Sequence, residues 1–571
     1  MSSGFLKEKH IKAIEFPHFP TRQQAIVWRN WEMVPVERIA KALNTNKENI
    51  LKLAEEMGLN IPPDINEYWL ERGYITIIRQ NWHLLTYKQI LILLDWTKQK
   101  LEYTLKEDDF LFHKLGHFKP EVEEVVYSPL SQEEKAQTVQ IRELIKEYFP
   151  ETKSSSNFDP FGFLKDFVEN RQSESIYFTQ CEEDRVVHDD EIIIDDSWNI
   201  ELSNTMQQSL GKQTQIDIAR VNIFVDRFID NMRNMWGIKL TSFIFANKHN
   251  SDENSNKENP NVGTECTRGS TDCKIILDIK PDSSLMSESH IIEIYDNSIS
   301  ITAVDEVGLL RGLQWIENQM KTRGGPCLKK QIIKRKNRFD IRYIYSYFAV
   351  YGDPLLDPEL DPYPDGLLSH LSDIGVNGVW LQAVLYNMVP WDKKPELSED
   401  WEKRIQGLRD IVKRAGDYGI GVYLYINEPR AMPEEFFNNH PEWKGSSHLE
   451  LKSLCTSNKD IQDYLRNGVA KLFNEVPDLA GLFTITMSEN HTNCYSHVFA
   501  GNKPDCPRCS KRSQAEVIAE VNNIIAEGAH SVKPDARVIA WMWGWNSKWS
   551  DEAISLLNDD VIVMCRNICR H

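Results

Sequence analysis

The sequence has no apolar run of about 18 residues, the length that a membrane-spanning helix requires. Its N-terminal stretch, MSSGFLKEKHIKAIEF, also lacks the apolar segment of a secretory signal peptide. We therefore expect a cytoplasmic protein with no membrane partner. Positive charge is scarce as well, since 66 lysine and arginine residues face 85 acidic residues and give a formal net charge of −19. Nucleic-acid binding depends on a basic face that neutralises phosphates, so this balance predicts no nucleic-acid partner.

Cysteine is sparse too. Ten cysteines are scattered over 571 residues, without the dense spacing of a small disulfide-linked scaffold, so we expect reduced thiols. The chain is long, and its 571 residues predict roughly three or four domains of about 150 residues each. The apolar patterns divide the chain into a helical module at 1–152, an α+β domain at 159–330 and an α/β domain at 338–571.

The helical module contains an internal two-fold repeat. Residues 29–56 align with residues 80–107 at a constant offset of 51, which matches Trp31 with Trp82. Apolar residues three, four and seven positions apart predict two short amphipathic helices in each copy. In the first copy, Thr45 or Asn46 is a candidate N-cap of the second helix, because both side chains can accept a backbone hydrogen bond.

The same two helices invite a helix-turn-helix interpretation for residues 36–59, with Gly58 ending the second helix. A helix that reads DNA needs basic or amide side chains aimed at base edges. Here the two basic residues are outnumbered by acidic ones: Lys47 and Lys52 against Glu48, Glu55 and Glu56. We therefore favour a module for helical packing or oligomerisation, which leaves a homo-oligomer open.

Residues 338–571 show strand-like runs, each followed by a helical stretch. The runs number six and lie at residues 340–348, 378–384, 421–426, 481–487, 537–543 and 560–565. Repeated strand–helix units predict a parallel sheet with right-handed crossovers, and no Gly-x-Gly-x-x-Gly follows any of these strands. The expected fold class is thus a multidomain protein with a (β/α)₈ TIM-type barrel. Because a closed barrel needs eight strands, we expect this one to be truncated after strand six.

In such barrels the active site forms at the carboxyl ends of the strands. Polar and aromatic residues gather at these ends in the sequence: Gln382, Asn427, Glu428, Ser488, Glu489, Trp541 and Trp543. Indole rings beside amides and carboxylates suit a sugar, whose hydroxyls need fixed polar partners. Glu489 directly follows a buried apolar strand, and glycosidic cleavage needs a carboxylic acid that protonates the leaving oxygen. The sequence therefore predicts Glu489 as a general acid.

The segment SISITAVDEVGLLRGLQWIENQM at residues 298–320 resembles the small α+β domain that precedes the barrel in family 20 glycoside hydrolases, the β-N-acetylhexosaminidases, and in α-glucuronidases. The resemblance continues through residues 338–342, where hexosaminidases carry an arginine on the first barrel strand. It implies that Arg342 binds hydroxyls of the sugar, that Glu489 is the general acid, and that Trp541 and Trp543 surround the sugar.

One position departs from that family. Hexosaminidases place an aspartate directly before the acid, where it orients the acetamido group of the substrate as internal nucleophile, and this chain has Ser488 there. A serine cannot stabilise a developing oxazolinium cation by charge. Either the acetamido mechanism is altered, or the substrate lacks that group and another carboxylate acts as nucleophile or base.

Cysteines gather only in the segment after Glu489. Cys506 and Cys509 have the two-residue spacing of a zinc knuckle, and Cys494 lies nearby. A fourth ligand could come from Cys455, His491 or His497, but the sequence has no second close pair. Zinc binding and simple packing of thiols both remain open. We favour packing, and therefore expect no metal and no cofactor.

The most concrete interpretation is a hexosaminidase-like glycoside hydrolase with a carbohydrate substrate. Its catalytic residues would be Glu489 and Ser488, and its substrate-binding residues Arg342, Gln382, Asn427, Glu428, Trp541 and Trp543. One alternative is a carbohydrate-binding barrel that is non-catalytic or inactivated by truncation. The other is a sugar-responsive regulator that uses the N-terminal helical repeat.

Overall fold

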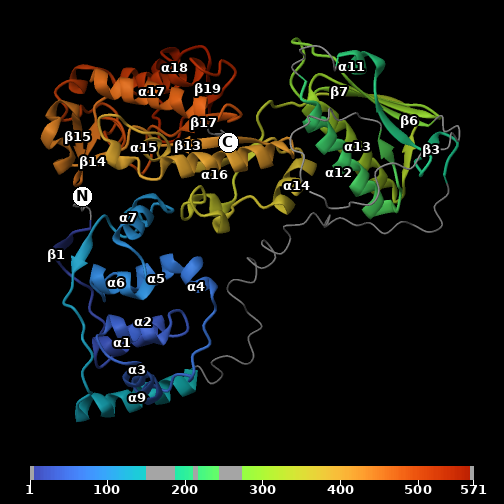
Figure 1. Cartoon of the computed structure of the whole chain (residues 1–571). Coiled ribbons are helices and arrows are strands. Elements are labelled where there is room, and N and C mark those ends of the chain that lie inside the picture. Colours follow the sequence, from blue (N-terminus) through green and yellow to red (C-terminus); the bar gives the residue numbers. More distant parts are fainter. Residues whose placement is uncertain (1–5, 149–186, 210–215, 243–272, 566–571) are drawn as a thin grey trace, which may run out of the picture.

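The computed structural model describes residues 6–148, 187–209, 216–242 and 273–565. They form three parts with separate apolar cores (Figure 1). The helical module lies beneath the part that holds the C-terminal sheet, and the α+β part lies to one side. Residues 159–186 of the predicted α+β domain are outside the described ranges. No helix within these ranges is both long enough and apolar enough to cross a membrane.

Two triplets of short helices follow each other in the N-terminal module: α1 (Arg22–Asn30), α2 (Val36–Ala42) and α3 (Lys47–Met57), then α5 (Tyr74–Asn81), α6 (Tyr87–Leu94) and α7 (Lys98–Glu107). Each copy thus has a leading helix, α1 or α5, that the sequence interpretation missed. Asn46 caps α3 by accepting a hydrogen bond from the Asn49 amide, and Gly58 ends this helix with φ of +82°, both as predicted. The module also contains α4 (Tyr68–Glu71), α8 (Leu111–Lys114), α9 (Gln132–Tyr148), β1 (Glu8–Lys12) and β2 (Lys119–Glu121).

The two copies meet through equivalent residues. Asn30 and Asn81, which the offset of 51 relates, are both fully buried, and each amide donates to the oxygen of the other at 3.0 and 2.7 Å. Arg29 and Gln80 likewise donate to the backbone carbonyl of each other. Reciprocal contacts between equivalent positions are the mark of a two-fold arrangement, so the repeat in the sequence is an approximate two-fold in space.

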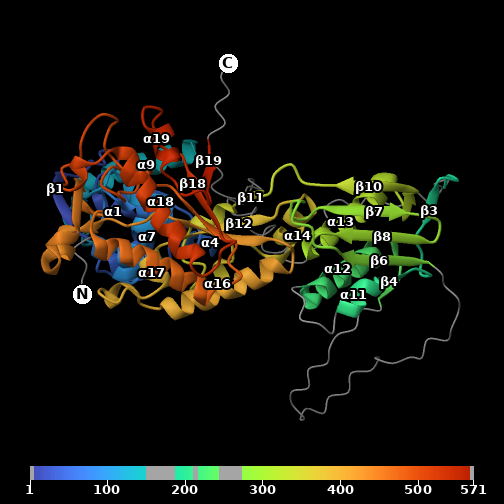
Figure 2. The same ribbon diagram turned by 90° about the horizontal axis from the view of Figure 1, so that it is seen from above.

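The α+β part is a six-stranded sheet covered on one face by two long helices. The strand order is β10-β7-β8-β6-β4-β5, with bounds β4 (Asn199–Leu202), β5 (Thr241–Ser242), β6 (Lys274–Ile279), β7 (His290–Ile294), β8 (Ser298–Ala303) and β10 (Gln331–Arg335). The helices are α12 (Ile218–Trp236) and α13 (Glu306–Arg323). Both contact the C-terminal part, since Arg220 donates to the Gly416 carbonyl oxygen and Arg311 to that of Ser372; Figure 2 shows the α+β part beside the half-barrel. The remaining elements are α11 (Asn204–Ser209) and the pair β3 (Glu191–Ile193) and β9 (Cys327–Lys329).

The C-terminal part is a curled parallel sheet with the form of a half-barrel. Its strands lie in chain order: β11 (Tyr343–Ile344), β12 (Gly378–Ala383), β13 (Gly421–Ile426), β17 (Gly481–Thr484), β18 (Arg537–Trp541) and β19 (Val561–Met564). All six predicted runs contribute a strand, although the first supplies only two paired residues. Within the described residues β11 and β19 each pair on one side only, so the sheet stays open.

The helices of the half-barrel cover the outer face of this sheet. They are α14 (Asp365–Asp373), α15 (Leu385–Met388), α16 (Trp401–Gly416), α17 (Lys459–Glu475), α18 (Gln514–His530) and α19 (Ser550–Ser555). Alternate strand residues point to opposite faces, and the outward set is aliphatic, with Val379, Leu381, Val422, Leu424 and Leu482 fully buried in the core beneath these helices. The inward set is mainly aromatic, with Ile539 and Ile562 added by the last two strands: Tyr343, Trp380, Tyr423, Tyr425, Phe483 and Trp541.

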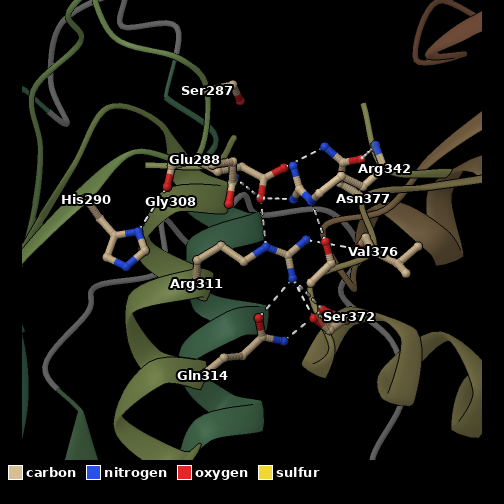
Figure 3. Close-up of polar contacts among 12 residues, drawn as sticks. Ser287, Glu288, His290, Gly308, Arg311, Gln314, Arg342, Ser372, Val376 and Asn377 are labelled. Atoms are coloured by element: carbon tan, nitrogen blue, oxygen red, sulfur yellow. Dashed lines mark hydrogen bonds and ion pairs between the residues drawn. The ribbon is translucent and has the colours of Figure 1, made fainter. Parts of the chain in front are cut away.

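A buried carboxylate joins the α+β part to the half-barrel (Figure 3). Glu288, just before β7, accepts hydrogen bonds from Arg311 of α13 at 2.9 Å and from Arg342 at 2.6 Å through Oε2, and from Asn377 at 2.8 Å through Oε1. Arg342 and Asn377 lie just before β11 and β12. Burial raises the pKa of Glu288, but the Arg311 and Arg342 guanidiniums and the Asn377 amide outweigh it and hold the pKa below its usual 4.5.

Arg311 extends this network to the backbone of the half-barrel. Its guanidinium donates to the carbonyl oxygens of Ser372 at 2.6 Å and Val376 at 3.0 Å, and Gln314 donates to the Ser372 hydroxyl at 2.8 Å. The side chain of Arg311 is 9% exposed and that of Glu288 is 4% exposed. Removing one partner of a pair this deeply buried leaves the other charge uncompensated.

We predict that Glu288→Gln lowers the free energy of unfolding by about 3–5 kcal/mol at neutral pH, because two guanidiniums then face each other without a carboxylate. A depressed pKa contributes stability that is present above pH 4.5 and is lost as the pH falls through the folded-state pKa. The difference between wild type and variant should therefore shrink in acid. Urea unfolding at several pH values tests both points. The matched control is Glu201→Gln, which breaks a more exposed pair with Lys274 and should cost at most about 1 kcal/mol.

Candidate functional site

The carboxyl edge of the half-barrel sheet brings most of the predicted site residues together. Gln382 of β12 pairs in register with Tyr425 of β13, and Tyr425 pairs with Phe483 of β17. Asn427 follows Tyr425 by two residues and so continues along the inner face of the sheet. Trp541 ends β18 on the same face, with its ring 6.4 Å from that of Phe483. The inner face thus ends in amides and indoles.

Ser488 and Glu489 follow β17 and complete this edge. Asn427 donates to the Ser488 hydroxyl at 2.8 Å, and Ser488 also accepts from the Asn490 amide at 3.2 Å. The Tyr425 hydroxyl and Asn427 Oδ1 are buried and reach no hydrogen-bond geometry with a described residue. Burial raises the pKa of Tyr425, and the nearby Glu489 carboxylate adds to the rise, whereas the side chains of Ser488 and Asn427 oppose it. Tyr425, Asn427, Ser488 and Glu489 thus form one polar cluster at the end of the inner face.

Aromatic rings beside these groups reach solvent. Tyr345 and Trp380 stack at 4.5 Å, and Trp541 meets Trp543 nearly edge-on at 5.3 Å. Tyr345 is 47% exposed and Trp543 36% exposed. Flat apolar surfaces of this kind favour stacking with the C–H faces of a ring-shaped polar ligand.

Glu428, predicted to bind substrate, is buried and bonded to the backbone. It is 2% exposed, and its carboxylate accepts hydrogen bonds from the amides of Leu385 at 2.8 Å and Arg430 at 3.1 Å. Leu385 is the first residue of α15, so Glu428 fastens the loop after β13 to that helix. Burial raises the pKa of Glu428 to about 7, against these two hydrogen bonds. Its oxygens are engaged by backbone, so the direct sugar contact expected of Glu428 is not what the geometry provides.

Arg342 lies at the opposite end of the sheet from the one that the sequence predicted. It precedes β11, at the amino end of the sheet, whereas Glu489 follows β17 at the carboxyl end. Its guanidinium is held by Glu288 and by the carbonyl oxygens of Gly375 and Phe339. Arg342 therefore joins two parts of the chain, and the expectation that it binds the sugar is wrong for this structure.

A residue of the helical module enters the site, which no sequence pattern indicated. Glu107, the last residue of α7, forms a buried ion pair with Arg430, and both side chains are 8% exposed. The Glu107 carbonyl oxygen accepts a hydrogen bond from Gln382 Nε2 at 3.0 Å. α7 lies directly under the half-barrel, whereas α3 lies far from it (Figure 1). Only the second copy of the repeat reaches the site.

The residues after Glu107 strengthen this contact. Asp108 accepts from the Gly352 amide of the half-barrel at 3.0 Å and from the Tyr74 hydroxyl of the module at 2.6 Å. Burial raises the pKa of Asp108 to about 7, although both hydrogen bonds oppose the rise. Asp109 accepts from the Tyr351 hydroxyl at 3.1 Å. Three consecutive acidic residues thus anchor the end of α7.

The module and the half-barrel enclose a cavity of about 110 Å³. Glu107, His113 and His117 of the module line it together with Arg430, Glu489 and His491 of the half-barrel. Ligand pockets commonly measure about 300–1,000 Å³, so the docked module leaves room for a small group only. Glu489 is half-buried and borders this cavity, whereas Gln382, Trp541 and Trp543 are not among the residues that line it.

No protein-family model matches the sequence, and no protein with curated annotation matches it. Solved structures with a similar fold include the chitobiase FjGH20 of Flavobacterium johnsoniae, with 17% identity, 66% of this chain and 53% of that chain covered, and a TM-score of 0.38. A GH138 enzyme targeting pectin rhamnogalacturonan II has 14% identity, 64% and 38% coverage and a TM-score of 0.43. The GH20 β-N-acetylhexosaminidase of Streptomyces coelicolor has 12% identity, 67% coverage of both chains and a TM-score of 0.37.

The chain spans about half the length of the first of these structures. Glycoside hydrolases of family 20 are thus among the structures that the chain resembles, as the resemblance of residues 298–342 led us to expect. Similarity at this level concerns the fold alone.

We predict that Glu107→Gln loosens the contact between α7 and the half-barrel, because it leaves the Arg430 guanidinium buried without a charge partner. A cost of about 3 kcal/mol corresponds to roughly a hundredfold faster amide exchange in α7 and around Arg430, which hydrogen-exchange mass spectrometry would measure. Glu56→Gln is the matched control, since Glu56 is the equivalent residue of the first copy and should leave α7 unchanged. Equal protection in wild type and Glu107→Gln would contradict this role of the ion pair.

Proposed function

We propose that this chain hydrolyses glycosidic bonds at the carboxyl edge of the half-barrel sheet, with Glu489 as general acid. The observation that supports this best is the position of Glu489, which follows β17, borders the cavity and lies beside the polar side chains of Tyr425, Asn427 and Ser488. A carboxylic acid there can protonate the oxygen of the leaving group as the bond breaks. Gln382 and Asn427 supply polar contacts, and Trp541 and Trp543 supply ring faces.

Ser488 defines the chemistry that this site can support. Its hydroxyl is fixed by Asn427 and carries no charge, so it cannot stabilise an oxazolinium cation as a carboxylate does. Hydrolysis assisted by an acetamido group would then be weak, and sugars without that group are the better substrates. A second carboxylate is needed in that case, and Glu107 is the other acidic residue that lines the cavity.

We further propose that the docked module moves when a sugar enters the cavity and reaches Gln382. The Gln382 amide is already used by the Glu107 carbonyl oxygen, and the cavity is smaller than a typical ligand pocket. Separation of α7 from the half-barrel would free Gln382, Arg430 and Glu107 together. The form of the chain with α7 docked is therefore the resting form of the proposed enzyme.

The small cavity beside the docked α7 also favours a second candidate, a carbohydrate-binding protein without catalysis. Glu107 is neutralised by Arg430, so the cavity as it stands contains one acidic group without a charged partner opposite it. A regulator that reads DNA has less support. α3 packs one face against α9, and its exposed residues include Glu48 and Glu55, while the equivalent helix α7 docks on the half-barrel.

We predict that the chain hydrolyses one or more members of a panel of aryl glycosides, and that Glu489→Gln lowers kcat by about 100- to 10,000-fold. The loss should be largest with poor leaving groups and small with activated ones, because only the former need a proton from the acid. Glu396→Gln, at an exposed position of the same half-barrel, should leave kcat unchanged.

The panel should include N-acetylglucosaminides and sugars without an acetamido group, and it should be run on Glu107→Gln as well as on wild type. Binding of a sugar without turnover by either form would favour the non-catalytic candidate. If neither form binds or hydrolyses any member, the site at this edge is not a carbohydrate site.

A further inference from the structure

Four buried cysteines outside the proposed catalytic site converge from three chain segments. They are 0 to 1% exposed, and their sulfur atoms all lie within 4.8 Å of one another: Cys455, Cys494, Cys506 and Cys509, here called the cysteine cluster. Cys455 follows β16 (Leu451–Leu454), and Cys494 lies in the loop after β17. Cys506 and Cys509 form a two-residue knuckle before α18. This answers the question of the fourth ligand that the sequence left open.

The distances between the sulfur atoms distinguish a disulfide from a zinc site. Cys455 Sγ lies 3.6 Å from Cys506 Sγ and 3.6 Å from Cys509 Sγ. A disulfide needs about 2.05 Å, so these are not bonded pairs. Four thiolates about 2.3 Å from a zinc ion form a tetrahedron with edges of about 3.8 Å. The observed separations correspond to the edges of that tetrahedron.

The groups around the cluster suit a site of negative charge. Four thiolates and one Zn²⁺ sum to −2, and the Arg508 guanidinium donates to Cys455 Sγ at 3.2 Å. The hydroxyls of Ser453 and Ser457 lie 3.4 Å from Cys494 Sγ and Cys509 Sγ. Such outer contacts orient metal ligands and offset their charge.

Gly445 shows how closely the backbone approaches the cluster. A Cβ atom at this position would lie 2.7 Å from Cys494 Sγ and 2.3 Å from the Ser453 hydroxyl oxygen. Only a residue without a side chain fits there. A hydrophobic core of four packing thiols would not by itself explain why polar and cationic groups surround the sulfur atoms.

We propose that the cysteine cluster binds one structural Zn²⁺. All four positions of the tetrahedron are taken by protein ligands, so no position is left for substrate or water, as in other structural sites. Binding converts the thiols to thiolates and releases their protons to solvent. The inference stands on the four residues alone and does not depend on the proposed glycosidase activity.

The zinc would fix the loop that carries the candidate acid. β14 (Met432–Pro433), β16 and β15 (Lys444–His448) form a small antiparallel sheet, and Cys455 links this sheet to the loop after β17. The loop is also tied to β15 by His491, whose Nε2 lies 2.8 Å from the Ser446 carbonyl oxygen. Glu489 is two residues before His491, so the metal would hold the position of Glu489 relative to the cavity.

Metal analysis of the full chain, purified without chelator, tests the proposal directly. We expect one zinc per chain, and its release by a mercurial reagent in proportion to four thiols. Cobalt(II) exchanged into the site should give the intense visible bands and thiolate charge-transfer absorption of a tetrahedral Co–S₄ centre. A folded chain that stays free of metal when zinc is supplied, or one that holds iron instead, would overturn the proposal.

A matched pair of variants assigns the metal to the cluster. Cys509→Ser should lower the zinc content to well below one per chain and speed amide exchange in residues 488–512. Cys327→Ser, at a buried cysteine in the α+β part, should keep one zinc per chain. If Cys509→Ser fails to fold, the zinc and cobalt measurements on wild type still decide the question. Zinc binding with no glycosidase activity would support this proposal and contradict only the proposed function.

Discussion

The buried ion pair between Glu107 and Arg430 is the contact on which the form of the proposed site depends. Two charges that are each 8% exposed stabilise one another only when α7 lies against the half-barrel. That placement uses the Gln382 amide and forms one wall of the cavity of about 110 Å³ beside Glu489.

Local patterns in the sequence predicted the elements well. All six strand-like runs predicted in residues 338–571 contribute a strand to the half-barrel sheet. The Asn46 cap and the Gly58 terminus of α3 follow from side-chain chemistry within a few residues. The offset of 51 predicted the repeat, although the unit of two helices expected for each copy did not include the leading helices α1 and α5. These successes all rest on interactions between near neighbours in sequence.

The errors concern residues whose partners are distant in sequence. Arg342 is followed by a strand of only two paired residues, so the position of its side chain at the amino end could not be predicted from its neighbours. Its actual partner, Glu288, lies 54 positions away. Glu428 looks like a site carboxylate by position, yet two backbone amides use its oxygens. Glu107 and Arg430 are 323 positions apart, and no periodicity links them.

The loop after β17 is restrained by buried contacts within the half-barrel and by a smaller contact with the helical module. On one side the cysteine cluster and His491 tie it to the small sheet of β14, β16 and β15 through buried groups on several segments. On the other side the helical module reaches the cavity through the short segment at the end of α7. Breaking the first would require unfolding the interior of the half-barrel, whereas breaking the second exposes two charges and a few polar groups at an edge. Opening of the cavity should therefore occur on the side of the module, while Glu489 stays in place.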